Sequence, residues 1–294
     1  MGKQGAGIGK ICYNESKEGK NVGKVLCSTG ALIGRPNGRD YRLLEGCMDR
    51  LHCDGFEFML YDSWYPEIDA LSAFLGKLSL PVSVFHCEKH VGELIGRNEP
   101  GDKEEAFSKF RVNCELASFL GADRMVLHLW NGIQSDEHFP RHLAAYKKLH
   151  AMAKAHGITL TVENVVCAYG DPLDHWQKLK EAYPEVCFTF DTKMAAFHGQ
   201  TDFIFGEEFR WLWDGKHIRH LHVNDYGGGY MDWQNLKTLH VGQGKIDFEG
   251  FFAALRERNY QGDYTVEATS FLPDGVIHWE ELNDTFARIR DYIR

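Results

Sequence analysis

Acidic side chains end several short apolar runs in this sequence. Three of these runs read Leu-Thr-Val-Glu, Phe-Thr-Phe-Asp and Tyr-Thr-Val-Glu, and they end at Glu163, Asp191 and Glu267. In an extended strand, residues two positions apart share one face, so each acid lies beside a threonine while apolar groups cover the other face. A polar group delivered repeatedly at a strand end is typical of a binding or catalytic site.

Histidines follow the same pattern in the segment from Lys216 to Gly229, which reads K-H-I-R-H-L-H-V-N-D-Y-G-G-G. Alternation places His220, His222 and Asn224 on one face before a glycine-rich loop begins. Taken alone, the segment could equally be an edge strand with a hydrated polar face. Because the acidic strand ends show the same pattern of polar groups on one face, we interpret this segment as part of the same site.

Strand, loop and helix patterns alternate from Gly23 to the C-terminus. Short apolar runs predict eight strands, at 25–28, 55–60, 82–85, 125–128, 158–163, 186–190, 218–223 and 264–266. Apolar residues at helical spacing and capping residues predict helices at 39–51, 66–78, 102–120, 138–156, after Asp171-Pro172, and at 203–213, 248–258 and 279–293. This alternation indicates parallel strands and an α/β fold, a single-domain (β/α)8 barrel. A doubly wound open sheet is the alternative, and it predicts one dominant ligand loop.

Composition limits the classes of function. The chain has 294 residues, 44% of them hydrophobic, and a net charge of −9, which argues against a nucleic-acid binder. No apolar run approaches the ~18 residues of a membrane span, and no secretory signal pattern opens the chain. None of the eight cysteines forms a C-x-x-C pair, so we expect reduced thiols and a cytoplasmic location. We expect residues 1–21 to form a flexible or loosely docked extension and residues 22–294 to form the barrel.

In a barrel of this kind, the carboxyl ends of the strands converge on one mouth. Glu163, Asp191, His222 and Glu267 are then expected to meet, despite their separation in the sequence. Three carboxylates and one imidazole suit a divalent ion such as Mn²⁺, Mg²⁺, Co²⁺ or Zn²⁺. If His222 binds the ion through one nitrogen, its other N–H requires an acceptor that orients the ring.

The strand ends T-V-E-N, F-D-T-K-M, H-L-H-V-N-D and Y-T-V-E-A, with the run H-V-G-Q-G-K-I-D-F, resemble those of the xylose isomerase-like TIM barrels. The resemblance extends from about Val25 to the C-terminus. It implies one divalent metal ion held by Glu163, Asp191, His222 and Glu267. It also implies a sugar or cyclitol isomerase or epimerase, in which Glu163 and Glu267 exchange a proton beside a substrate carbonyl through an enediolate.

The family also contains inosose-dehydratase-like lyases and apurinic endonucleases. The endonucleases require a further histidine after the metal-binding aspartate, and Met194 stands at that position here. His86 and His128 stand where the endonucleases have extra ligands, and we interpret both as contacts to substrate. A non-catalytic ligand-binding barrel is a further alternative, which the presence of both glutamates disfavours.

Other candidate substrate contacts are Trp130, Glu57, Asn224 and His240, the last of which precedes a G-x-G turn. The expected partner is a small-molecule sugar or cyclitol. We expect no nucleic acid and no membrane as partners, and a homo-oligomer is left open. Substrate specificity is expected in the loops that follow the strands.

Overall fold

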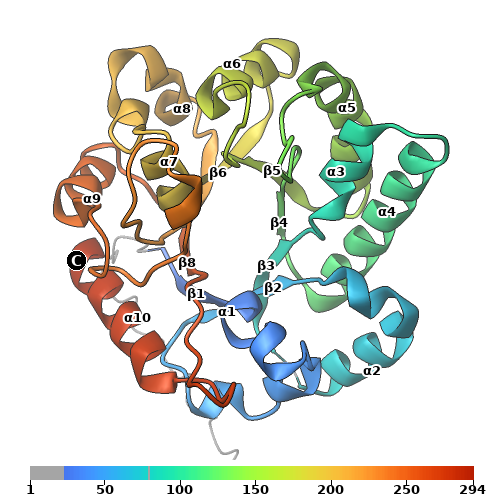
Figure 1. Cartoon of the computed structure of the whole chain (residues 1–294), viewed down its shortest axis with the longest axis vertical. Coiled ribbons are helices and arrows are strands. Elements are labelled where there is room, and N and C mark those ends of the chain that lie inside the picture. The colour runs from blue at the N-terminus through green and yellow to red at the C-terminus, as the bar shows by residue number, and fades with distance from the viewer. Residues whose placement is uncertain (1–22, 79) are drawn as a thin grey trace, which may run out of the picture.

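The computed structural model describes residues 23–78 and 80–294, so the expected extension at residues 1–21 lies outside the described residues. Eight parallel strands pair in sequence order and close into a barrel, with helices around them (Figure 1). The strands are β1 (Val25–Ser28), β2 (Gly55–Met59), β3 (Val82–His86), β4 (Arg124–Leu127), β5 (Thr159–Glu163), β6 (Cys187–Asp191), β7 (Ile218–His222) and β8 (Asp263–Val266). The predicted (β/α)8 barrel is confirmed, and the open sheet is wrong.

Helices, the longer of which agree with the amphipathic patterns of the sequence, surround the strands. They are α1 (Thr29–Leu32), α2 (Ile68–Leu78), α3 (His90–Arg97), α4 (Asp102–Leu120), α5 (Phe139–Ala155), α6 (Pro172–Ala182), α7 (Thr192–Phe197), α8 (Arg210–Asp214), α9 (Phe248–Glu257) and α10 (Trp279–Ile293). The expected cap of α6 is present, because the Asp171 side chain accepts hydrogen bonds from the Leu173 and Asp174 amides. Each helix in the described residues is too short or too polar to cross a membrane.

Two expected helices are wrong in extent, at 39–51 and 203–213. The first region forms short 3₁₀ turns at Tyr41–Leu44 and Cys47–Asp49, because Gly46 between them has a left-handed φ of +76°. The second is divided by Gly206, whose backbone is extended.

Large apolar side chains fill the layer between the strands and the helices. Phe188 on β6, for example, stacks on Trp176 of α6 with ring centroids 4.3 Å apart. Burial of one such side chain stabilises the fold by about 1.5–3 kcal/mol. This outer layer holds each strand in register and thereby fixes where its last residue lies.

The lumen of the barrel has a different composition. Leu26, Val84 and Val126 form a small apolar cluster inside it. The threonines expected beside the acids also point inward, and the Thr161 and Thr189 hydroxyls hydrogen-bond to each other at 2.7 Å.

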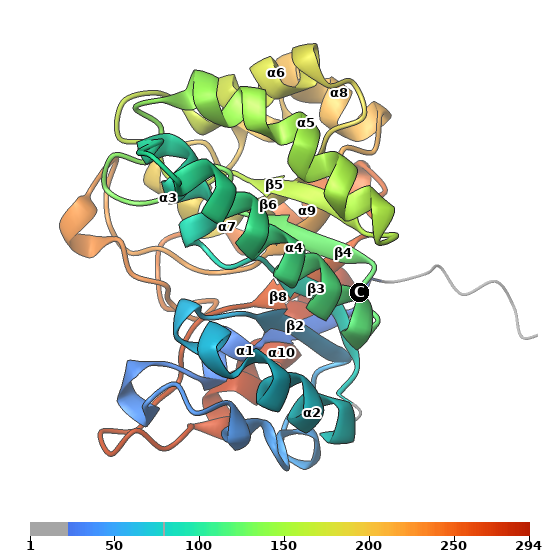
Figure 2. The ribbon, with the colours of Figure 1, turned by 90° about the vertical axis from the view of Figure 1, so that its right-hand side faces the viewer.

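Two short helices, α3 and α7, occupy regions that the sequence predicted as loops. They are the first helices after β3 and β6 and lie on the side of the barrel opposite the C-terminus of the chain (Figure 2). Both therefore border the end of the barrel at which the polar strand ends emerge.

Candidate metal centre and active site

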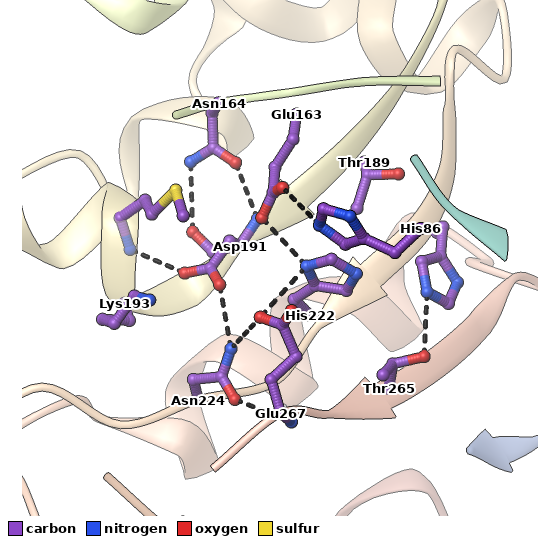
Figure 3. Close-up of polar contacts among 12 residues, drawn as sticks. His86, Glu163, Asn164, Thr189, Asp191, Lys193, His222, Asn224, Thr265 and Glu267 are labelled. Atoms are coloured by element: carbon purple, nitrogen blue, oxygen red, sulfur yellow. Dashed lines mark hydrogen bonds and ion pairs between the residues drawn. The ribbon is translucent and has the colours of Figure 1, made fainter. Parts of the chain in front are cut away.

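The four metal-binding candidates come together at the carboxyl ends of four consecutive strands. Glu163, Asp191 and His222 are the last residues of β5, β6 and β7, and Glu267 directly follows β8. One donor atom from each lies within 4.8 Å of the others (Figure 3). The first three side chains are fully buried, and the Glu267 side chain is 12% exposed.

The distances between these donor atoms fit a shared divalent ion. Nδ1 of His222 lies 2.9 Å from Glu163 Oε1 and 3.3 Å from Glu267 Oε2. Two donors about 2.1 Å from one ion and at right angles to each other are ~3.0 Å apart. The chemistry of the donors agrees, since carboxylate oxygens and an imidazole suit Mg²⁺, Mn²⁺, Co²⁺ and Zn²⁺.

Electrostatics also favour a cation at this position. Burial raises the pKa of Asp191 to about 6; the charge of Lys193 opposes this shift, while the charges of Glu163 and Glu267 add to it. Buried carboxylates this close repel one another unless a positive charge lies between them.

Two asparagines hold the carboxylates in place. Asn224 donates through Nδ2 to Asp191 Oδ2 at 2.8 Å and to Glu267 Oε2 at 3.0 Å, and it accepts from the Glu267 amide at 3.1 Å. Asn164 pairs with the Asp191 backbone through both ends of its amide, at 2.7 and 3.1 Å. Asn224 was expected to contact substrate, and its buried position gives it hydrogen bonds to two expected metal ligands.

Glu57 lies inside the barrel beneath the metal-binding candidates. Its Oε2 accepts hydrogen bonds from His222 Nε2 at 3.0 Å and from His220 Nε2 at 2.9 Å. Burial raises the pKa of Glu57, but the charge of His222 and the hydrogen bonds from both histidines outweigh burial and hold that pKa well below its usual range. Glu57 is fully buried and does not line the cavity described below. Its hydrogen bond to Nε2 provides the acceptor that orients the His222 ring.

Sequence reasoning proposed Glu57 as a contact to substrate and did not identify it as the partner of His222. The available signal was an acid in the middle of an otherwise apolar strand, Gly-Phe-Glu-Phe-Met. An unpaired carboxylate inside a barrel is costly, which predicts a cationic or N–H partner but does not say which one.

His86 and His128 lie on the other side of Glu163. Nε2 of His128 is 2.6 Å from Glu163 Oε2, and Nε2 of His86 is 3.7 Å from the same oxygen. Both side chains are buried, and neither lines the cavity described below. Contacts to substrate were expected for both residues, but the groups they approach belong to Glu163, a metal-binding candidate. Burial lowers the pKa of His128 to about 4, although the charge of Glu163 opposes this shift. These three residues form a second group whose donor atoms lie within 4.8 Å of one another.

Trp130 and His240 lie outside the candidate cluster, which consists of Glu163, Asp191, His222 and Glu267. Trp130 is fully buried and donates through Nε1 to the Val165 carbonyl at 2.8 Å. The ring nitrogens of His240 hydrogen-bond to the hydroxyls of Thr285 and Ser270, each at 2.8 Å. Neither residue lines the cavity, so their observed contacts stabilise loops and helices.

A cavity of about 340 Å³ opens beside the candidate cluster, and Glu267 forms part of its wall. Three expected specificity loops contribute to it, through Tyr61, Lys89 and Thr238. Lys193 also lines the cavity, and its ammonium donates to the Thr238 hydroxyl at 3.1 Å. Sequence reasoning gave no role to Lys193, although it lies two residues after Asp191 at the end of β6, and it missed Arg39, which lies in a loop without a strand-end signal.

Comparisons with known proteins agree with the fold. Residues 48–290 match a family model described as xylose isomerase-like TIM barrel. No curated protein matches the chain closely enough to count as a relative.

Several solved structures share the fold. D-Allulose 3-epimerase from Methylomonas sp. is 17% identical, with a TM-score of 0.68, and the match covers 92% of this chain and 98% of that one. For 3-keto-D-glucoside 4-epimerase from E. coli, identity is 17%, the TM-score is 0.64 and the coverages are 92% and 99%. A D-tagatose 3-epimerase-like protein is 19% identical, with a TM-score of 0.65, and the match covers 92% of this chain and 97% of that one.

Proposed function

Because this chain belongs to the xylose isomerase-like TIM barrel family, we propose that it is a divalent-metal-dependent isomerase or epimerase of sugars or cyclitols. The observation that carries the proposal is the cluster of Glu163, Asp191, His222 and Glu267 beside a cavity of about 340 Å³. The solved structures of similar fold include sugar epimerases, which supports the same class of reaction.

The four clustered side chains would hold one divalent ion. When bound, such an ion polarises a substrate carbonyl and makes the neighbouring C–H bond more acidic. His222 would present Nδ1 to the ion, since Nε2 is engaged by Glu57 at 3.0 Å.

Glu163 and Glu267 are proposed as the proton-transfer pair. They stand at the ends of β5 and β8, and a carboxylate oxygen of each lies near the same atom, Nδ1 of His222, at 2.9 and 3.3 Å. One carboxylate removes a proton from the carbon beside the carbonyl, and the other group, protonated as a carboxylic acid for this step, returns its proton to the opposite face of the substrate. Glu267 reaches the cavity directly, whereas Glu163 is fully buried beneath it.

Proton exchange in D₂O tests the proposal. Purified protein is analysed for metal and then incubated with a panel of ketoses and inososes, and deuterium incorporation beside the carbonyl is measured. Glu163→Gln and Glu267→Gln should each slow exchange by roughly 10²–10⁴-fold, the usual contribution of one acid–base group. Glu249→Gln on the exposed face of α9 is the matched control and should have no effect.

Metal content must be measured in each variant, because both glutamates are also expected ligands. A metal-loaded Glu267→Gln protein that exchanges at the wild-type rate would show that the proposed pair is wrong. A product lighter than the substrate by one water would identify a lyase instead.

A further inference from the structure

We propose that Arg39 and Lys89 form an anion-binding site in the wall of the cavity, and that the substrate is therefore a sugar carrying a phosphate or carboxylate group. This inference rests on the proposed function, because it concerns the same cavity. Both residues line that cavity together with Glu267 of the candidate cluster. One ligand can thus contact both the candidate cluster and the two cations.

Arg39 is held in place and lacks an acceptor. Its carbonyl accepts a hydrogen bond from Trp64 Nε1 at 2.9 Å, and its guanidinium carbon lies 4.8 Å from the centroid of the Tyr61 ring. Its Nε is buried and has no hydrogen-bond partner among residues 23–78 and 80–294. A buried N–H without a partner is destabilising, so the site gains when a ligand supplies an acceptor.

Lys89 lies between β3 and α3 and is half-buried. Within the part of the chain that the structure describes, neither Lys89 nor Arg39 has a carboxylate oxygen within 4.0 Å of its charged nitrogens. Two positive charges on the wall of one cavity therefore have no internal counter-ion.

Asp62 and Glu88, two acidic residues of the cavity wall, have polar partners other than Arg39 and Lys89. Asp62 lies 2.6 Å from Lys109 Nζ, and Glu88 accepts from His90 Nδ1 at 2.6 Å. The three carboxylates of the candidate cluster carry one more negative charge than a divalent ion would balance. Lys193 lies nearby and supplies one positive charge. None of these contacts involves Arg39 or Lys89, so both residues can meet an anionic ligand.

An oxyanion fits this site better than a hydroxyl does. The guanidinium fork matches the paired oxygens of phosphate and carboxylate, and hydrogen bonds between ionised partners are about twice as strong as neutral ones. The cavity volume of about 340 Å³ lies near the lower end of small-molecule pockets, roughly 300–1,000 Å³. Bringing an uncharged sugar into the cavity would leave both cations partly desolvated and unpaired.

Calorimetry with unreactive polyols tests the proposal separately from catalysis. Ribitol, ribitol 5-phosphate and ribonate lack a carbonyl that could react, and each is titrated into the metal-loaded protein. We expect the phosphate ester or the carboxylate to bind at least ~10-fold more tightly than ribitol, the scale of one charge-assisted hydrogen bond. The tighter of the two charged probes identifies the natural anionic group.

Charge-removing variants assign the effect to the two residues. Arg39→Gln and Lys89→Gln should each weaken binding of the preferred anion by ~10-fold and leave ribitol binding unchanged. Arg39→Lys should restore part of the affinity, which guards against a folding defect. Lys77→Gln on the exposed face of α2 is the control and should bind as the wild type does.

Equal affinity for all three probes, or unchanged anion affinity in both Gln variants, would overturn the proposed anion site. That result would leave the D₂O exchange experiment intact as a test of the isomerase. Conversely, anion binding that depends on Arg39, in a protein that exchanges no substrate proton, would retain the site and reject the proposed function.

Discussion

His222 Nε2 donates a 3.0 Å hydrogen bond to Glu57 Oε2 inside the barrel, where both side chains are fully buried. The bond fixes the histidine ring so that Nδ1 points toward Glu163 and Glu267. A carboxylate on the far nitrogen also increases the basicity of the nitrogen that binds a metal. Glu57 is therefore a positioning residue for the expected metal centre, although it lies on β2, far from β7 in sequence.

Replacement of Glu57 should weaken metal binding, although it removes none of the four expected ligands. We expect Glu57→Gln to reduce metal affinity by about 10–100-fold, and Glu57→Ala to reduce it further because no acceptor remains for His222. Competition against a fluorescent chelator measures the affinity, and circular dichroism checks the fold. Glu67→Gln, whose side chain is 44% exposed, is the control. Wild-type affinity in a folded Glu57→Ala protein would refute the orienting role.

His222→Ala should abolish metal retention while leaving the barrel folded, since one of the four expected ligands is lost. Elemental analysis of purified protein should find one equivalent of divalent metal per chain in the wild type. Two equivalents would instead indicate that the group of His86, His128 and Glu163 also binds an ion.

Asp191→Asn should weaken metal binding much more than His128→Ala. The amide removes a negative charge from the expected ligand set, whereas His128 contacts Glu163 from outside that set, at 2.6 Å. Isothermal titration of both chelator-treated variants with Mn²⁺ gives the comparison. Similar losses in the two variants would make His128 a ligand.

Asp136 should stabilise the loop after β5. Its carboxylate accepts from the Ala168, Tyr169 and Gly170 amides at 2.8, 3.0 and 2.5 Å, and from His175 Nε2 at 3.2 Å. We expect Asp136→Asn to lower the free energy of unfolding by about 2–4 kcal/mol at pH 7, because buried N–H groups lose an ionised acceptor. Urea unfolding measures the difference, with Asp123→Asn, 76% exposed, as the control.

The same variant should change the pH dependence of stability. Burial raises the pKa of Asp136, but the hydrogen bonds from His175 and the three amides outweigh burial and hold that pKa well below its usual range. A lowered pKa in the folded state means that the contribution is complete above the unfolded value of about 3.9 and is lost as pH falls below it. Asp136→Asn should therefore lose less stability than the wild type between about pH 4 and pH 2. Parallel curves for both proteins would contradict this account.

The sequence alone determined the barrel and the strand ends that carry the metal-binding candidates. Alternation in Leu-Thr-Val-Glu or His-Leu-His is a local property, because a strand turns successive side chains to opposite faces whatever surrounds it. Parallel order then follows from the regular repetition of strand and helix, and it places Glu163, Asp191, His222 and Glu267 at one end. These inferences needed no knowledge of which residues touch.

Tertiary structure alone decided which groups meet across the barrel. Glu57 and His222 are 165 positions apart and come together only because the sheet closes on itself. Arg39 and Lys89 reach one cavity from loops after β1 and β3, and Trp130 and His240 turn away from it. The conformation of a loop depends on non-local packing and on single backbone angles, such as that of Gly46, and neither has a periodic signature in the sequence.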